Sequence, residues 1–481
     1  MSLRKKTITG IIWNFAQQIG RRGIGIVITL LLARFLAPAD YGLVAMMAVF
    51  LDVANRLMDS GFKQALIRLE SAWQTDLNTA FYANLGLGAV SYALLFLAAP
   101  LIAGFYDEPR LIELIRVAGL GILINAFQVV QSAILSRELN FKAQLQATIP
   151  AGIISGIVAV GLAYAGLGVW ALITQMLLSS LITTALLWRL QGWRPALSFS
   201  RRSVGSMYNF GYKLFLSGLL DTVFRNISVI VIAKLFAASI TGYYFFANKL
   251  NDLVIAQFAG SIQNVTYPAL ASIQGDDKRL KAGYRNVIQM TTFMLFPSML
   301  FLAALAEPLF DFALPDKWFP AVLYLQLMCI AGFMYPLHSI NLNILKVKAR
   351  SDLFLYLEII KKAMAVIILF ICYRYGVIGI LIGQIIGSVL AYIPNSYFSS
   401  MLINYTVREQ MADFMPGLAL SGVVALVIYG TGLLIHWPTI VKLSALGLAA
   451  GILYLAGAHL LKLQAYVLAR QMLTARMSRS G

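Results

Sequence analysis

Long hydrophobic segments follow one another along the chain, and polar residues are concentrated in the short stretches between them. A helix needs ~20 mainly apolar residues to cross a bilayer, and by this measure the sequence predicts about fourteen spanning helices. The alternation of apolar and polar residues typical of a membrane barrel is absent from the sequence. We therefore predict an all-α polytopic membrane protein.

The first hydrophobic segment, residues 8–35, departs from the apolar pattern along one side of its predicted helix. Gln18, Arg21 and Arg22 recur there at steps of three and four, so they share one helix face, whereas the opposite face is apolar. An arginine near the bilayer centre is costly and is tolerated only toward protein or a water-filled cavity. We expect this face to line a wet, positively charged interior. The alternative is a polar face that packs in a hydrogen-bonded bundle.

Three later predicted spans, residues 42–65, 208–236 and 242–265, also place charged or amide side chains on one helix face. We predict that the cations and amides among them bind substrate, and that the carboxylates balance charge or bind a coupling ion. The alternative for each residue is a structural ion pair along its own helix. The side chains concerned are Asp52, Arg56, Asp221, Arg225, Lys249, Asn251 and Asp252.

A short internal repeat connects these segments. The run from Ala33 to Ala37 resembles the run from Ala233 to Ala237, an offset of 200 residues, and a glycine follows each run at 42 and at 242. At the same offset Asp52 falls on Asp252. Because about six spans separate the two copies, both would begin on the same side of the membrane.

The repeat predicts two lobes of about six helices each, related by a pseudo-twofold axis along the membrane normal, with a site between them. The basic linker from Arg189 to Arg202 is the best boundary between the lobes. We therefore expect an N-lobe over residues 1–200 and a C-lobe over residues 201–405. A C-terminal helix pair with a basic tail would occupy residues 406–481.

Composition supports the membrane assignment. The chain is 60% hydrophobic and 12% charged with a mean hydropathy of +0.78, whereas soluble domains carry about 25% charged residues. The net charge of +18 does not indicate nucleic-acid binding, because most basic residues fall in cytoplasmic segments if the N-terminus is cytoplasmic. We expect a multi-pass protein of the bacterial inner membrane with both termini cytoplasmic.

The sequence offers little support for catalysis. It shows no metal-ligand cluster, P-loop or nucleotide fingerprint, and its three histidines are scattered. Both cysteines fall within predicted spans, and the first segment is too long and too basic in its core for a cleavable signal peptide. We expect no enzyme activity and no cofactor beyond a Na⁺ or H⁺ coupling ion. Intramembrane cations favour an anionic guest, and arginine suits phosphate.

Three stretches carry a resemblance to a known family. Ala33 to Gly42 resembles the junction between the first two spans of the polysaccharide exporters called Wzx flippases. These share a superfamily with multidrug/toxin extrusion transporters and the lipid II flippase. Asp316 to Ala321 and Tyr335 to Lys362 are similar to the colanic-acid-exporter branch. One departure is Ser228 after Arg225-Asn226-Ile227, where that branch tends to have aspartate, so a coupling role for that carboxylate is not carried over.

The resemblance implies a transporter that moves an undecaprenyl-pyrophosphate-linked oligosaccharide repeat unit from the cytoplasmic to the periplasmic leaflet. It implies alternating access through a central cationic cavity, in exopolysaccharide, capsule or O-antigen biosynthesis. The partners implied are the lipid-linked oligosaccharide, the bilayer, and the polymerase and chain-length proteins of the pathway.

A multidrug/toxin extruder of the same superfamily is the alternative function. Its guests are usually cationic, and intramembrane arginines disfavour them. A membrane glycosyltransferase or polymerase would need a substantial outer loop for its catalytic residues, but the predicted outer loops are short. A purely structural subunit would not need arginines at mid-membrane depth.

Overall fold

The computed structural model describes residues 13, 20, 23–69, 73–261 and 266–471, and this part contains α-helices and short 3-10 turns but no β-strand. In it, 10 helices are long and apolar enough to cross a membrane, or up to 11 with the bent pair of α5 (Leu111–Ala126) and α6 (Val129–Arg137). These helices confirm the predicted all-α multi-pass membrane protein.

The predicted number of about fourteen spans stays a prediction. The first segment is described as a continuous helix only over Gly23–Phe35, which is short for a span. Helix α10 (Ala238–Ser261) is not among the ten. Helices α16 (Ser351–Cys372) and α17 (Gly376–Ile403) are joined by a short 3-10 turn and count together as one 53-residue helix.

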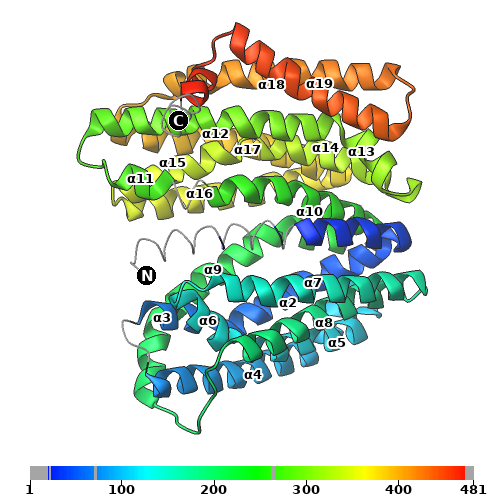
Figure 1. Cartoon of the computed structure of the whole chain (residues 1–481), viewed down its shortest axis with the longest axis vertical. Coiled ribbons are helices and arrows are strands. Elements are labelled where there is room, and N and C mark those ends of the chain that lie inside the picture. Colours follow the sequence, from blue (N-terminus) through cyan, green and yellow to red (C-terminus); the bar gives the residue numbers. More distant parts are fainter. Residues whose placement is uncertain (1–12, 14–19, 21–22, 70–72, 262–265, 472–481) are drawn as a thin grey trace, which may run out of the picture. The chain divides into compact units, whose positions relative to one another are not determined.

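Contacts divide the chain into two compact units, Met1–Phe245 and Phe246–Gly481. The first unit contains the helices before α10 together with the start of α10. Besides the helix Gly23–Phe35, α5 and α6, these helices are the following: α2 (Pro38–Asp59), α3 (Phe62–Arg68), α4 (Gln74–Tyr106), α7 (Phe141–Tyr164), α8 (Val169–Leu190) and α9 (Arg201–Leu235). Within this unit α7 packs along α8, and α5 packs along both α4 and α8 (Figure 1).

The division after Phe245 differs from the lobe boundary expected near residue 200, because the basic linker is held against the start of α4. Gln74 Nε2 donates to the Arg194 carbonyl at 2.9 Å, and Asn78 Nδ2 donates to Ser198 Oγ at 2.6 Å. Helix α9 then packs against α2, α3 and α4. The N-lobe over 1–200, the C-lobe over 201–405 and the C-terminal helix pair over 406–481 remain a prediction.

The ends of α2 follow from its local sequence. Proline at the first helical position needs no N–H partner, and Asp40 Oδ2 accepts the free N–H of Ala37 at 2.9 Å. The helix ends at Asp59, and the two residues that follow are left-handed: Ser60 with a φ of 41° and Gly61 with a φ of 80°, a conformation that glycine adopts without steric cost. A Cβ on Gly61 would also lie 2.6 Å from Gly211 Cα of α9, so α2 and α9 approach closely at this end.

The structure bears out the 200-residue repeat at the level of helix boundaries. One helix ends at Phe35 and α2 begins at Pro38. Helix α9 ends at Leu235 and α10 begins at Ala238, so each boundary recurs 200 residues later. The repeated sequences therefore form the same helix–corner–helix arrangement.

The second unit is built around a core of aromatic and aliphatic side chains that includes Tyr284, Phe296, Leu337 and Tyr405. Helix α12 packs against α18 and α14, and α17 packs against α14, α15 and α16 (Figure 1). The helices not yet given bounds are α11 (Tyr267–Ala271), α12 (Asp277–Ala304), α13 (Ala306–Ala313), α14 (Pro320–Gly332), α15 (Tyr335–Val347), α18 (Val407–Leu434) and α19 (Thr439–Leu460).

Candidate functional site

Helices α2 and α9 of the first unit pack together and present charged side chains at their surface. Asp52 and Arg56 are exposed on α2, and Asp221 and Arg225 are exposed on α9. Each pair is spaced by four residues and so lies on one helix face. We call these four residues the charged face of the first unit.

Three members of the charged face lie close together. The Arg56 guanidinium approaches α9 so closely that a Cβ built on Gly218 would be 2.9 Å from its Nη1. Arg225 and Arg56 are also the two cations whose fields act on the Asp52 carboxylate. The structure therefore brings together residues that are far apart in sequence, as expected for a site built by α2 and α9.

The arginines of the charged face are free to meet a ligand. Among the described residues, no nitrogen of Arg56 or Arg225 lies within 4.0 Å of a carboxylate oxygen. The ion pair between Asp52 and Arg56, which their spacing suggested, is therefore not formed in this part of the chain. Unpaired guanidinium groups offer several charge-assisted hydrogen bonds to a phosphate group.

Lys249, Asn251 and Asp252 belong to the second unit, on α10. Lys249 and Asp252 are exposed, and Asp252 accepts a hydrogen bond from Asn248 Nδ2 at 3.1 Å. Asn251 is buried, and its Oδ1 has no hydrogen-bond partner among the described residues. Because the two units are separate bodies, a shared site of these residues with the charged face stays a prediction.

Gln18, Arg21 and Arg22 lie outside the described residues, so their predicted role in substrate binding is untested. The helix that the structure describes after them in sequence, Gly23–Phe35, packs on α7. A Cβ on Gly156 of α7 would be 2.2 Å from Ile28 Cδ1. Glycine is therefore needed there for close helix packing.

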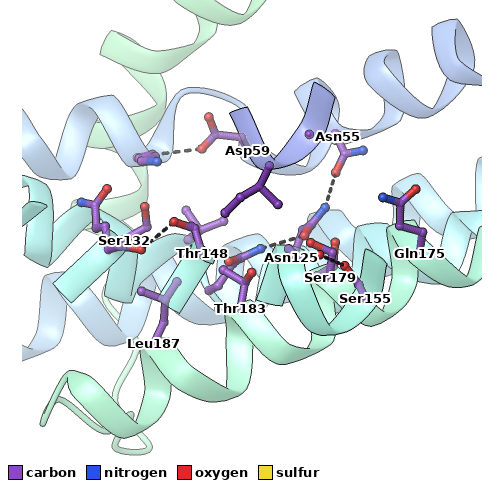
Figure 2. Close-up of a pocket in the computed structure, with 18 of the residues that line it drawn as sticks. Asn55, Asp59, Asn125, Ser132, Thr148, Ser155, Gln175, Ser179, Thr183 and Leu187 are labelled. Atoms are coloured by element: carbon purple, nitrogen blue, oxygen red, sulfur yellow. Dashed lines mark hydrogen bonds between the residues drawn. The ribbon is translucent and has the colours of Figure 1, made fainter. Parts of the chain in front are cut away.

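The first unit also contains a polar cavity, and no predicted site residue lines it in the described structure. Figure 2 shows this cavity, which α2, α5, α6, α7 and α8 line with amide and hydroxyl groups. No predicted site residue lies on α7 or α8, whose sequences are nearly free of charged residues. A signal was present, since Gln175, Ser179 and Thr183 recur at four-residue steps and so form a polar stripe on α8.

Neither region offers a metal site in the described part of the chain, where no group of three or more metal-ligating side chains occurs. The charged face can bind an anion through arginine, and the cavity can exchange hydrogen bonds with a neutral polar guest. Both belong to a helical membrane protein, so the arrangement is suited to recognising and moving a polar molecule.

Comparisons with known proteins agree with this description. A family described as polysaccharide biosynthesis protein matches residues 31–323. The lipopolysaccharide biosynthesis protein WzxC of Escherichia coli K12 is 26% identical over 82% of this chain and 81% of its own. The succinoglycan biosynthesis transport protein ExoT of Rhizobium meliloti is 25% identical over 70% of this chain and 68% of its own.

Solved structures with the same fold include two transporters. The lipid II flippase MurJ in an inward closed conformation superposes with a TM-score of 0.74 at 15% sequence identity, over 94% of this chain and 98% of its own. An inward-facing multidrug resistance transporter of the MATE family gives a TM-score of 0.61 at 16% identity, over 79% and 95%. At these identities the likeness concerns the fold alone.

Proposed function

Because this chain belongs to the family of polysaccharide biosynthesis proteins, we propose that it is a flippase for a lipid-linked oligosaccharide. The cargo is an oligosaccharide repeat unit on undecaprenyl pyrophosphate, and it moves from the cytoplasmic to the periplasmic leaflet. The relatives whose printed names concern lipopolysaccharide, teichuronic acid and succinoglycan support a role in making a cell-surface polysaccharide.

The observation that carries this proposal is the pair of arginines on the charged face. Arg56 and Arg225 lie on adjoining helices of a membrane transporter fold, and no carboxylate of the described residues forms an ion pair with them within 4.0 Å. Placing an arginine in a membrane span costs ~2.5–3.5 kcal/mol on insertion scales. A pyrophosphate offsets this cost, since it supplies negative charge and several hydrogen-bond acceptors.

The deletion of the gene tests the proposal. The deletion strain is expected to lose its surface polysaccharide and to accumulate the undecaprenyl-pyrophosphate-linked oligosaccharide on the cytoplasmic side of the membrane. Mass spectrometry of extracted lipids, before and after digestion of exposed glycans from outside the cell, measures both. A plasmid copy of the parent gene should restore the polymer. A deletion strain with normal polymer and no accumulated lipid contradicts the proposal.

A multidrug extruder is the second candidate, because the structure shares the fold of a MATE-family transporter. The charged face disfavours it, since Arg56 and Arg225 would repel the cationic guests that such a transporter usually carries. The same deletion strain separates the two functions. We expect unchanged susceptibility to cationic drugs, whereas increased susceptibility with normal polymer would favour the extruder.

The location and partners follow from the proposed cargo. A flippase for this lipid works in the bacterial inner membrane, and the distribution of basic residues supports cytoplasmic termini. The polymerase and chain-length proteins that consume the exported repeat unit are the proposed protein partners. Cross-linking of the tagged protein in cells, followed by identification of the captured membrane proteins, tests this part.

Transport of a charged lipid needs an energy source, and we propose Na⁺ or H⁺ coupling through Asp52. Its carboxylate lies beside Arg56 and Arg225 but forms no ion pair within 4.0 Å in the described residues. Asp252, at the matching position of the repeat, instead accepts from Asn248. We therefore expect Asp52→Asn to affect coupling more strongly than Asp252→Asn.

The expected result for Asp52→Asn is a several-fold slower transport that no longer responds to the Na⁺ or pH gradient. Flipping of the extracted lipid in proteoliposomes, with imposed gradients of either ion, measures this response. Asp252→Asn is the matched variant and should keep it. If both variants retain transport and its ion dependence, coupling lies in other residues.

A further inference from the structure

The polar cavity of the first unit is large enough for a ligand of its own. Its volume is about 620 Å³, within the range of small-molecule sites in proteins. Helices α2, α5, α6, α7 and α8 surround it, and Lys63 of α3 and Ile24, Gly25 and Ile28 of the helix Gly23–Phe35 also line it (Figure 2). The cavity thus lies inside one compact unit.

The lining is polar but almost uncharged. Among the described lining residues, the charged side chains are Asp59 and Lys63, which are of opposite sign and four residues apart. Asp59 Oδ1 also accepts the backbone N–H of Lys63 at 3.2 Å. The other polar groups are neutral amides and hydroxyls, so the cavity offers no net charge to a phosphate or an organic cation.

Part of the lining is held in place by a chain of hydrogen bonds. Gln128 Nε2 donates to Asn125 Oδ1 at 2.7 Å, and Asn125 Nδ2 donates to Asn55 Oδ1 at 3.1 Å. Asn55 Nδ2 in turn donates to the Leu51 carbonyl at 2.8 Å. Figure 2 shows the link between Asn55 and Asn125. These amides are therefore oriented before any ligand arrives, which lowers the entropic cost of binding.

Another part of the lining has unused hydrogen-bonding capacity. Gln175, Ser179 and Thr183 form the polar stripe of α8 along the cavity (Figure 2). Their side chains form no hydrogen bond with another described residue. Each can both donate and accept a hydrogen bond. Polar groups left without a partner in a membrane protein are costly, so the stripe calls for water or a polar guest.

We infer that this cavity is a saccharide subsite, which holds a neutral sugar residue of the cargo during transport. Sugar hydroxyls donate and accept hydrogen bonds, as the amides and hydroxyls of the lining do. The C–H faces of a sugar ring can pack on the aliphatic side chains of Ile28, Met58 and Leu187, which also line the cavity. An alkyl chain would leave the stripe without partners, and a pyrophosphate would find no unpaired cation among the described residues of the lining.

The subsite would complement the charged face. Asn55 lines the cavity and Arg56 belongs to the charged face, and consecutive helical residues point about 100° apart. Helix α2 therefore separates a neutral polar region from a cationic one at the same level along its axis. This division matches a cargo with a pyrophosphate joined to a neutral glycan. The inference rests on the proposed function, because the sugar belongs to the proposed cargo.

The test is a triple variant of the polar stripe, Gln175→Leu, Ser179→Ala and Thr183→Val. These changes keep approximate side-chain size and remove no hydrogen bond of the described structure, so we expect the protein to fold normally. Two probes are compared on full-length protein in lipid nanodiscs. One is the lipid-linked oligosaccharide extracted from the deletion strain, and the other is undecaprenyl pyrophosphate without a glycan.

We expect the parent protein to bind the glycosylated lipid more tightly than undecaprenyl pyrophosphate. The triple variant removes at least three neutral hydrogen bonds to the sugar, so it should bind the glycosylated lipid roughly 10- to 2,000-fold more weakly. Its Kd for undecaprenyl pyrophosphate should not change. Native mass spectrometry or a fluorescence titration gives both constants. If the triple variant is unstable, the double variant Ser179→Ala and Thr183→Val replaces it. The double variant should show a smaller loss of affinity for the glycosylated lipid and the same Kd for undecaprenyl pyrophosphate as the parent.

A matched control lies on the same helix. Thr174 belongs to α8 but is not part of the cavity lining, so Thr174→Val removes a hydroxyl without touching the cavity and should bind both lipids as the parent does. A triple variant that retains the parent's preference for the glycosylated lipid overturns the saccharide subsite while the proposed function stands. A parent protein that binds neither lipid overturns the proposed function and the subsite together.

Discussion

The variant Gly42→Val is expected to reduce transport at least about fivefold, because it removes a helix crossing that only glycine allows. A Cβ on Gly42 of α2 would lie 1.8 Å from the Ala238 carbonyl oxygen of α10. The contact is reciprocal, since a Cβ on Gly242 would lie 1.8 Å from the Pro38 carbonyl oxygen. The four residues are two pairs related by the 200-residue offset, so each copy of the repeat contributes one glycine to this crossing.

The two helices would have to move apart to accommodate any side chain at Gly42. Overpacking of this kind costs ~1–3 kcal/mol, which lowers the population of the closed crossing ~5- to 150-fold. The predicted topology places this crossing at the periplasmic end of the helices. A transporter that cannot close this end would be unable to complete its cycle, so loss of transport should accompany loss of the closed state.

Cys329 and Cys372 are first replaced by serine, and single cysteines are then introduced at the exposed positions Ala37 and Ala237. The distance between spin labels on these two cysteines reports how close the helices are at the crossing. The parent should show a short distance between the labels that Gly42→Val lacks. Gly86→Val is the matched control, because a Cβ on Gly86 of α4 meets nothing within 4 Å. A folded Gly42→Val protein with the short distance and normal transport contradicts the expectation.

The variants Arg56→Ala and Arg225→Ala should each weaken binding of undecaprenyl pyrophosphate strongly. Hydrogen bonds to charged groups contribute ~1.5–3 kcal/mol, so the loss expected for each variant is roughly 10- to 150-fold in Kd. Arg→Lys keeps the charge but loses the paired N–H donors, and should therefore give an intermediate loss. Binding of the parent should weaken as the salt concentration rises, because part of the attraction is between exposed charges.

Titration of undecaprenyl pyrophosphate into protein in nanodiscs measures these constants, and thermal unfolding shows whether each variant is folded. Arg110→Ala is the control, since Arg110 is paired with Glu108 at an Nε–Oε1 distance of 2.8 Å and lies in a loop. It should bind as the parent does. If the folded Arg56→Ala and Arg225→Ala proteins bind and flip the lipid normally, the charged face has another role.

Much of the charged face was visible in the sequence. The four-residue spacing of Asp52 and Arg56, and of Asp221 and Arg225, defines a helix face whatever that face contacts. A charge within an apolar span also stands out, because it is costly. What the spacing could not show is the partner, and Asp52 and Arg56 form no intrahelical ion pair in the described structure. Arg56 instead lies against Gly218 of α9.

The sequence by itself determined the helical membrane class, the positions of most helices and the 200-residue repeat, because these depend on hydrophobicity and local periodicity. Only the tertiary structure decided that Gly42 meets Ala238 and that the polar stripe of α8 lines a cavity. Neutral residues such as Ser179 are tolerated in a span on many surfaces, so their pattern alone carries little weight. The role of such residues depends on which helices pack around them. Contacts between residues far apart in the sequence decide that packing.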